Sequence, residues 1–73
     1  MARITIQAET AGTVWKIEAK IGSTVTEDNE IIVLESMHME IPVYPPMAGV
    51  LTHILVQEGE PVQEGQTLAV IEC

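Results

Sequence analysis

The stretch AGTVWKI at residues 11–17 returns as AGVLTHI at residues 48–54, and this repetition decides how the chain can fold. A shift of 37 residues aligns the chain with itself without a gap. Eight of the 25 pairs from Ala11/Ala48 to Glu35/Glu72 are then identical. Repetition at a fixed spacing indicates one supersecondary unit that is used twice around a shared core.

The two copies meet at a two-residue seam, Met37-His38. We expect a single domain over residues 1–73, with repeat halves at about 2–36 and 39–73. Position 38 aligns with the start of the chain and has no internal equivalent. A pseudo-two-fold arrangement therefore predicts that the termini lie at one end and the seam lies at the opposite tip.

Hydrophobic periodicity along the chain is that of strands. Ile4, Ile6 and Ala8 alternate with polar residues, which is typical of a half-buried strand. The runs Ile31–Leu34 and Leu68–Ile71 are short, apolar and equivalent in the two copies, which favours buried strands. We expect about eight strands and no helix. Two four-stranded antiparallel sheets that pack face to face, as a flattened barrel or sandwich, would bury them.

The second strand of each copy has a predicted inner face. Alternation places Trp15 and Ile17 inward in the first copy and Val50 and Ile54 inward in the second, with Lys16 facing outward. Because burial is the usual use of a large aromatic side chain, we expect Trp15 in the core or as a contact that caps it.

Composition excludes several classes of partner. The formal net charge is −8 with only three lysines and arginines, which argues against nucleic acid or an anionic membrane. No stretch is long enough to span a membrane. The single cysteine, Cys73, excludes an internal disulfide and fits a reducing cytosol, so we expect a cytoplasmic protein.

No catalytic constellation appears in the sequence. There is no suggestive spacing of serine, histidine and a third acid, no Cys/His metal pattern, and no glycine-rich phosphate loop before a helix. We therefore expect that the chain alone is not an enzyme and holds no metal ion.

The seam itself is chemically unusual. A tight turn of two residues fits between a strand that ends at Ser36 and one that starts at Met39. Neither Met37 nor His38 is a favoured turn residue. Such a conflict between local preference and fold is often functional.

The seam resembles a known attachment motif. ESMHMEI at residues 35–41 looks like the Glu-Ala/Ser-Met-Lys-Met motif of biotinyl (biotin carboxyl carrier) domains of the biotin/lipoyl attachment family. The internal two-fold, the eight strands, the exposed hairpin and the GEPVQEG turn at residues 59–65 also match, so the resemblance covers essentially the whole chain. Lipoyl domains usually carry Asp-Lys-Ala at the tip. The direct run from Val25 to Ile31 is similar to the short, thumbless type.

The resemblance implies a carrier domain of a biotin-dependent carboxylase, acetyl-CoA carboxylase-like or acting on a related acyl-CoA or 2-oxo acid. It implies biotin as the cofactor. It also implies biotin protein ligase, biotin carboxylase and carboxyltransferase components as partners. The cofactor-binding positions would be His38, Met37 and Met39, and the recognition residues would be Glu35, Ser36 and Glu40.

One residue departs from the family pattern, because His38 stands where the family has its acceptor lysine. Biotin is joined through an amide to a primary amine, whereas an acyl-imidazole is itself activated and hydrolyses. We therefore predict that this chain cannot be stably biotinylated at position 38. Lys16, in mid-strand, and Lys20, before a turn, are poor substitutes.

Three explanations of His38 stay open. It is an engineered replacement, a feature of a natural divergent paralogue that still docks to family partners, or the carrier of new chemistry. The last class includes a Cu(I) site at Met37-His38-Met39 and a phosphoryl-carrying histidine. The alternative functions are accordingly a non-biotinylated interaction or regulatory module, or a lipoyl-type carrier.

Overall fold

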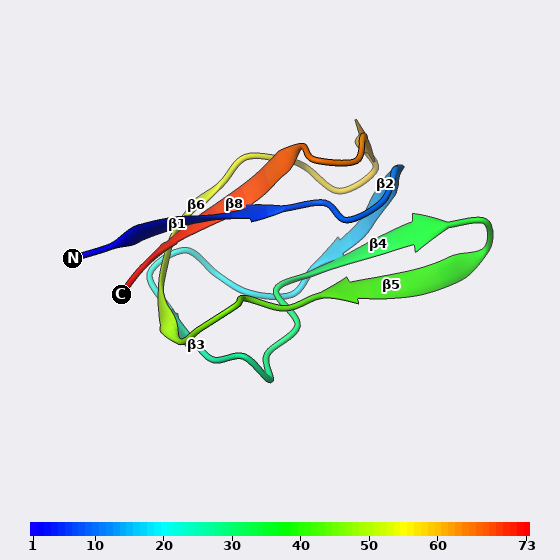
Figure 1. The fold of residues 1–73 in the computed structure, drawn as a ribbon. Coiled ribbons are helices and arrows are strands. Elements are labelled where there is room, and N and C mark those ends of the chain that lie inside the picture. The colour runs from blue at the N-terminus through cyan, green and yellow to red at the C-terminus, as the bar shows by residue number, and fades with distance from the viewer.

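The computed structural model describes residues 1–73 and contains eight β-strands and no helix (Figure 1). In chain order the strands are β1 (Arg3–Gln7), β2 (Gly12–Ile17), β3 (Thr24–Val25), β4 (Ile32–Ser36), β5 (Met39–Val43), β6 (Gly49–Ile54), β7 (Pro61–Val62) and β8 (Thr67–Glu72). The predicted all-β class is therefore confirmed. No helix in the structure is long and apolar enough to cross a membrane.

The strands form two four-stranded antiparallel sheets, ordered β1-β8-β6-β3 and β5-β4-β2-β7. The 37-residue shift converts β2 into β6 and β3 into β7 with matching bounds, and it carries one sheet order onto the other. The repeat of the sequence is thus the symmetry of the fold.

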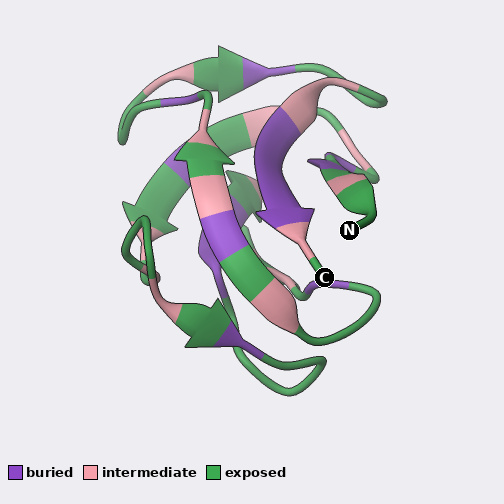
Figure 2. Cartoon of the chain, turned by 90° about the vertical axis from the view of Figure 1, so that its left-hand side faces the viewer, coloured by how far each residue is buried: buried purple, intermediate pink, exposed green.

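The core lies between the sheets and is built around their central strands. Every residue of the two apolar runs, Ile31–Leu34 and Leu68–Ile71, is buried. Figure 2 shows β8 buried over most of its length, down to its end near the C-terminus. Leu34 and Ile71 are equivalent in the two copies, and both are completely inaccessible to solvent. Burial of one such side chain contributes about 1.5–3 kcal/mol relative to leaving it exposed.

A β-bulge in each copy corrects part of the predicted inner face of β2 and β6. The register with the neighbouring strand shifts between Val14 and Lys16 in β2, and at the equivalent place in β6. An extra residue in one strand reverses the alternation of facing at that point. Before the bulge, Val14 points inward and Val50 is exposed, and Trp15 at the bulge is 46% exposed. Beyond the bulge the predicted facing is confirmed, because Ile17 and Ile54 pack against the core. The expectation of a buried Trp15 was wrong. Instead, the Lys16 ammonium lies 5.4 Å from the centre of its ring, which is within range of a cation–π contact.

The molecule is elongated, with extents of 36 × 18 × 18 Å. Figure 1 shows both termini at one end and the turn between β4 and β5 projecting at the other. At the terminal end, the backbones of Ala2 and Cys73 exchange two hydrogen bonds, of 2.9 and 3.0 Å. This places the seam of the repeat at the tip, opposite the chain ends, as the alignment predicts.

Candidate functional site

The tip is a two-residue β-hairpin turn. Strand β4 ends at Ser36, which lies directly opposite Met39 at the start of β5. The two residues between them, Met37 and His38, have φ angles of 51° and 66°. Positive φ at both central residues defines a type I′ turn, which normally uses Asn-Gly because side chains with a Cβ are strained there. The hairpin thus holds two bulky residues in a backbone conformation that neither favours.

The turn exposes the methionine on each side of His38. Met37 is 90% exposed and Met39 is 65% exposed. Methionine side chains are flexible and polarisable, so they adapt to an irregular apolar surface. Exposure at this level leaves both side chains unpacked in the free domain and available to a partner.

His38 is exposed at the outermost point of the turn and forms no hydrogen bond or ion pair within the chain. No group on the domain orients its imidazole or competes for its nitrogen atoms. The structure therefore places a free imidazole at the outermost point of the hairpin. This side chain does not fit the amide chemistry that attaches biotin, because an imidazole nitrogen forms only an activated acyl derivative.

Glu35 and Glu40 are direct cross-strand neighbours, one residue pair below the tip. Like charges that lie opposite one another in an antiparallel ladder are destabilising. The pseudo-two-fold converts this pair into Glu72 and Arg3, which also lie opposite each other and form an ion pair of 3.5 Å. The same place in the fold thus carries attraction at the terminal end and repulsion at the tip.

A glycine that sequence reasoning did not single out for the site supports the base of the hairpin. A Cβ atom on Gly12 would lie 2.6 Å from the carbonyl oxygen of Glu35, and one on Gly49 would lie 2.7 Å from that of Glu72. Only a residue without a side chain permits this approach of β2 to β4. The signal was in the sequence, because both glycines are conserved between the two copies.

The remaining basic residues of the first half lie away from the tip. Lys16 lies opposite Val33 in the pair of β2 with β4, which is three residues down β4 from Ser36. Lys20 follows β2 in an exposed loop. No three histidine, cysteine, aspartate or glutamate side chains gather closely enough to hold a metal ion. The described geometry therefore concentrates the candidate residues on one hairpin: Glu35, Ser36, Met37, His38, Met39 and Glu40.

Comparison with known proteins agrees with this geometry. The family model described as "Biotin-requiring enzyme" matches residues 4–71. The chain is 35% identical over 65 residues to a biotin/lipoyl attachment protein of Bacillus subtilis, with 89% of each chain covered. It is 36% identical over 67 residues to a biotin carboxyl carrier protein of Streptococcus mutans, covering 92% of this chain and 52% of that one.

Among solved structures, the chain resembles part of the urea carboxylase of Kluyveromyces lactis, with a TM-score of 0.92 and 29% identity. The match covers 99% of this chain but only 6% of the carboxylase. The fold and the site therefore define a small carrier domain whose exposed hairpin presents one residue, in a class that is not catalytic by itself. The chain belongs to the biotin/lipoyl attachment family.

Proposed function

We propose that this chain is the carrier-type domain of a biotin-dependent carboxylase and presents its hairpin tip to the other components. Biotin protein ligase, a biotin carboxylase and a carboxyltransferase are the proposed partners. The observation that carries this proposal is the tip itself, where Met37, His38 and Met39 project from a strained type I′ turn at the far end from the termini. The parent enzyme is an acetyl-CoA carboxylase or a related acyl-CoA or 2-oxo acid carboxylase.

We propose further that the chain as written remains in the apo form. His38 offers no primary amine, and Lys16 and Lys20 lie away from the tip. The chemistry that forms a lasting amide therefore has no acceptor at the place that the hairpin presents. The single exposed cysteine, Cys73, is compatible with a reducing compartment, and we place the protein in the cytoplasm.

A second candidate function is an interaction or regulatory module that occupies family partners without cargo. Two features of the hairpin favour it, because each lowers stability and neither serves the fold. Met37 and His38 form a strained turn, and Glu35 and Glu40 form a repulsive charge pair. Local conflicts of this kind are expected where a function requires them.

The test is co-expression with a biotin protein ligase, for the chain with His38 and for His38→Lys, followed by intact mass and a streptavidin shift. We expect that only the variant gains one biotin and that the chain with His38 gains none. A biotin adduct on Lys16 or Lys20 of the chain with His38 would contradict the apo assignment. If His38→Lys is lipoylated by a lipoyl ligase and not biotinylated, the domain is a lipoyl-type carrier.

Competition tests the interaction module. An excess of the chain with His38 is added to a reaction in which the ligase modifies the His38→Lys variant. Slower modification shows that the histidine-bearing hairpin still docks, as the interaction module requires. The matched control is a competitor with His38 that carries both Met37→Ser and Met39→Ser. This double variant lacks the exposed apolar side chains but keeps the strands intact. Equal rates with and without the chain that carries His38 would exclude the interaction module.

A further inference from the structure

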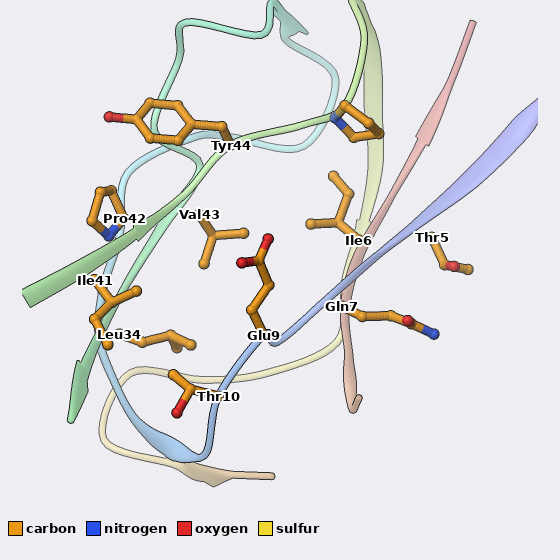
Figure 3. A pocket seen from close by; sticks show the side chains of 11 residues that line it. Thr5, Ile6, Gln7, Glu9, Thr10, Leu34, Ile41, Pro42, Val43 and Tyr44 are labelled. Carbon is orange, nitrogen blue, oxygen red and sulfur yellow. The ribbon is translucent and has the colours of Figure 1, made fainter. Parts of the chain in front are cut away.

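A groove of about 430 Å³ opens between the two edge strands β1 and β5 (Figure 3). Each of these strands has only one neighbour in its sheet, β8 and β4 respectively. The buried side chains of Ile6 and Leu34 contribute to its lining. The pseudo-two-fold relates one wall to the other, since Thr5 and Gln7 on β1 are equivalent to Pro42 and Tyr44.

The wall formed by β1 has free backbone hydrogen-bonding groups. Ala2 and Cys73 form a pair that exchanges two hydrogen bonds, and from there the register of β1 with β8 continues without a shift as far as Thr5, which lies opposite Val70. In an antiparallel ladder, pairs that exchange hydrogen bonds alternate with pairs that do not. The N–H and C=O groups of Arg3 and Thr5 therefore point away from β8. Those of Thr5 lie at the groove.

The wall formed by β5 is blocked at the equivalent place. Val43 bonds back toward β4, because its carbonyl oxygen accepts a hydrogen bond of 3.0 Å from the N–H of Ile31. The preceding residue, Pro42, therefore directs its backbone outward, as its equivalent Thr5 does. Proline has no N–H, and its presence is a common way to protect an edge strand from further pairing. The two edges differ, and only β1 can accept another strand by a full set of hydrogen bonds.

The only charge in the lining of the groove is negative. Glu9 is the single charged residue in its lining, and Figure 3 shows its carboxylate projecting between the two walls. The chain as a whole has a net charge of −8. A second copy of this chain would bring another −8 and another Glu9, so charge complementarity favours a basic occupant.

We propose that the edge groove binds an extended basic segment of a partner protein, which adds to the sheet as a strand beside β1. Its backbone pairs with the free groups of Arg3 and Thr5, and a lysine or arginine of the segment lies against Glu9. An apolar side chain at an alternate position covers Ile6. Strand addition to an exposed sheet edge is a general mode of peptide recognition, in which the main chain supplies affinity and side-chain pockets supply specificity. This binding surface is separate from the hairpin tip and does not depend on His38.

The test uses a nine-residue peptide of alternating lysine and valine, titrated into ¹⁵N-labelled protein and followed by amide chemical shifts and hydrogen exchange. A peptide of alternating glutamate and valine is the matched probe. We expect the lysine peptide to shift the amide signals of β1 and to slow exchange at Thr5 by about tenfold or more. The glutamate peptide should leave both unchanged. Shifts that spread evenly over the acidic surface, or that cluster at the hairpin tip, would overturn the proposal.

The variant Thr5→Pro copies Pro42 onto the open edge, and Pro42 itself shows that the fold accepts proline there. We expect it to weaken binding by about tenfold, equivalent to the loss of the one backbone hydrogen bond that the Thr5 N–H would donate. Glu9→Gln should weaken binding several-fold at low salt, whereas Glu64→Gln, an exposed acid on a turn outside the groove, should not. Unchanged binding in Thr5→Pro would overturn the proposal. So would a dimer of the protein alone that Thr5→Pro dissociates, because the occupant would then be a second copy.

Discussion

The tip and the terminal end of this domain are the same piece of structure used twice, and they differ in how the strand pair is closed and in the charges that lie opposite each other. At the terminal end, Ala2 and Cys73 pair through two hydrogen bonds, and Arg3 forms an ion pair with Glu72. At the tip, the equivalent residues are closed by a strained turn, and the ion pair is replaced by two opposed glutamates. The terminal end shows that the fold does not require the features of the tip. We take these features to serve recognition.

The comparison assumes that the two halves contribute equally to the stability of the core, and this can be tested first. Leu34→Ala and Ile71→Ala truncate equivalent, fully buried residues. We expect each to lower the free energy of unfolding by about 3 kcal/mol, because each removes buried methyl groups and leaves a cavity. Urea unfolding monitored by Trp15 fluorescence measures it. A difference of more than about 1.5 kcal/mol between the variants would show that one half dominates the core.

Gly12 and Gly49, where one strand lies close to the backbone of the next, allow a test that should affect the two ends differently. Gly12→Ala and Gly49→Ala each place a methyl group against a backbone carbonyl, on Glu35 and Glu72 respectively. We expect each to destabilise by about 2 kcal/mol through forced displacement of the backbone. Only Gly12→Ala should also shift the amide NMR signals of the tip. Thr13→Ala, an exposed neighbour, is the control and should be nearly neutral.

The turn has no counterpart at the terminal end. Replacing its two residues by ones that prefer positive φ therefore measures how much its backbone strain lowers stability. Replacing Met37 by Asn and His38 by Gly supplies the residues that a type I′ turn prefers. We expect the double variant to be more stable by about 1–2 kcal/mol, since two residues then adopt positive φ with less strain. Thermal unfolding would detect this as a higher midpoint. A lower midpoint would mean that the methionine or the histidine makes a stabilising contact in the free domain.

The charge pair gives the smallest expected effect. Glu40→Arg rebuilds at the tip the Arg3–Glu72 pair of the terminal end. We expect a gain of about 0.5 kcal/mol, which should fall as salt is added, because both partners are exposed and screened. Glu40→Gln should give part of the gain with less dependence on salt. If neither substitution changes the unfolding midpoint at low salt, the two glutamates do not repel each other measurably.

Much of the fold could be predicted because a repeat constrains it at every position. The eight strands and the opposed placement of termini and tip both follow from aligning the chain on itself and from its hydrophobic periodicity. The facing of β2 up to Trp15 could not be predicted, because the bulge at Trp15 adds a residue that strict alternation does not count, whereas Ile17 beyond it packs inward as expected. Periodicity alone therefore placed Trp15 inside, although it is exposed.

The candidate site shows a similar division. Its position was predictable from the seam and from the family motif, and the opposition of Glu35 to Glu40 follows once the turn has two residues. The role of Gly12 was not predicted, since close approach of two backbones depends on how the strands cross. The groove at β1 was not predicted either. Its free hydrogen-bonding groups are defined by strand order, which the sequence does not specify directly.

The pairing of Ala2 with Cys73 also determines how the domain would respond to mechanical force. These residues lie at the open end of the antiparallel pair of β1 with β8. A pull that separates the two ends acts across this ladder and not along it, so hydrogen bonds break one pair at a time from the terminal end. The domain would unzip in this direction at low force. A pull between the tip and either terminus would act along the strands and load many hydrogen bonds together.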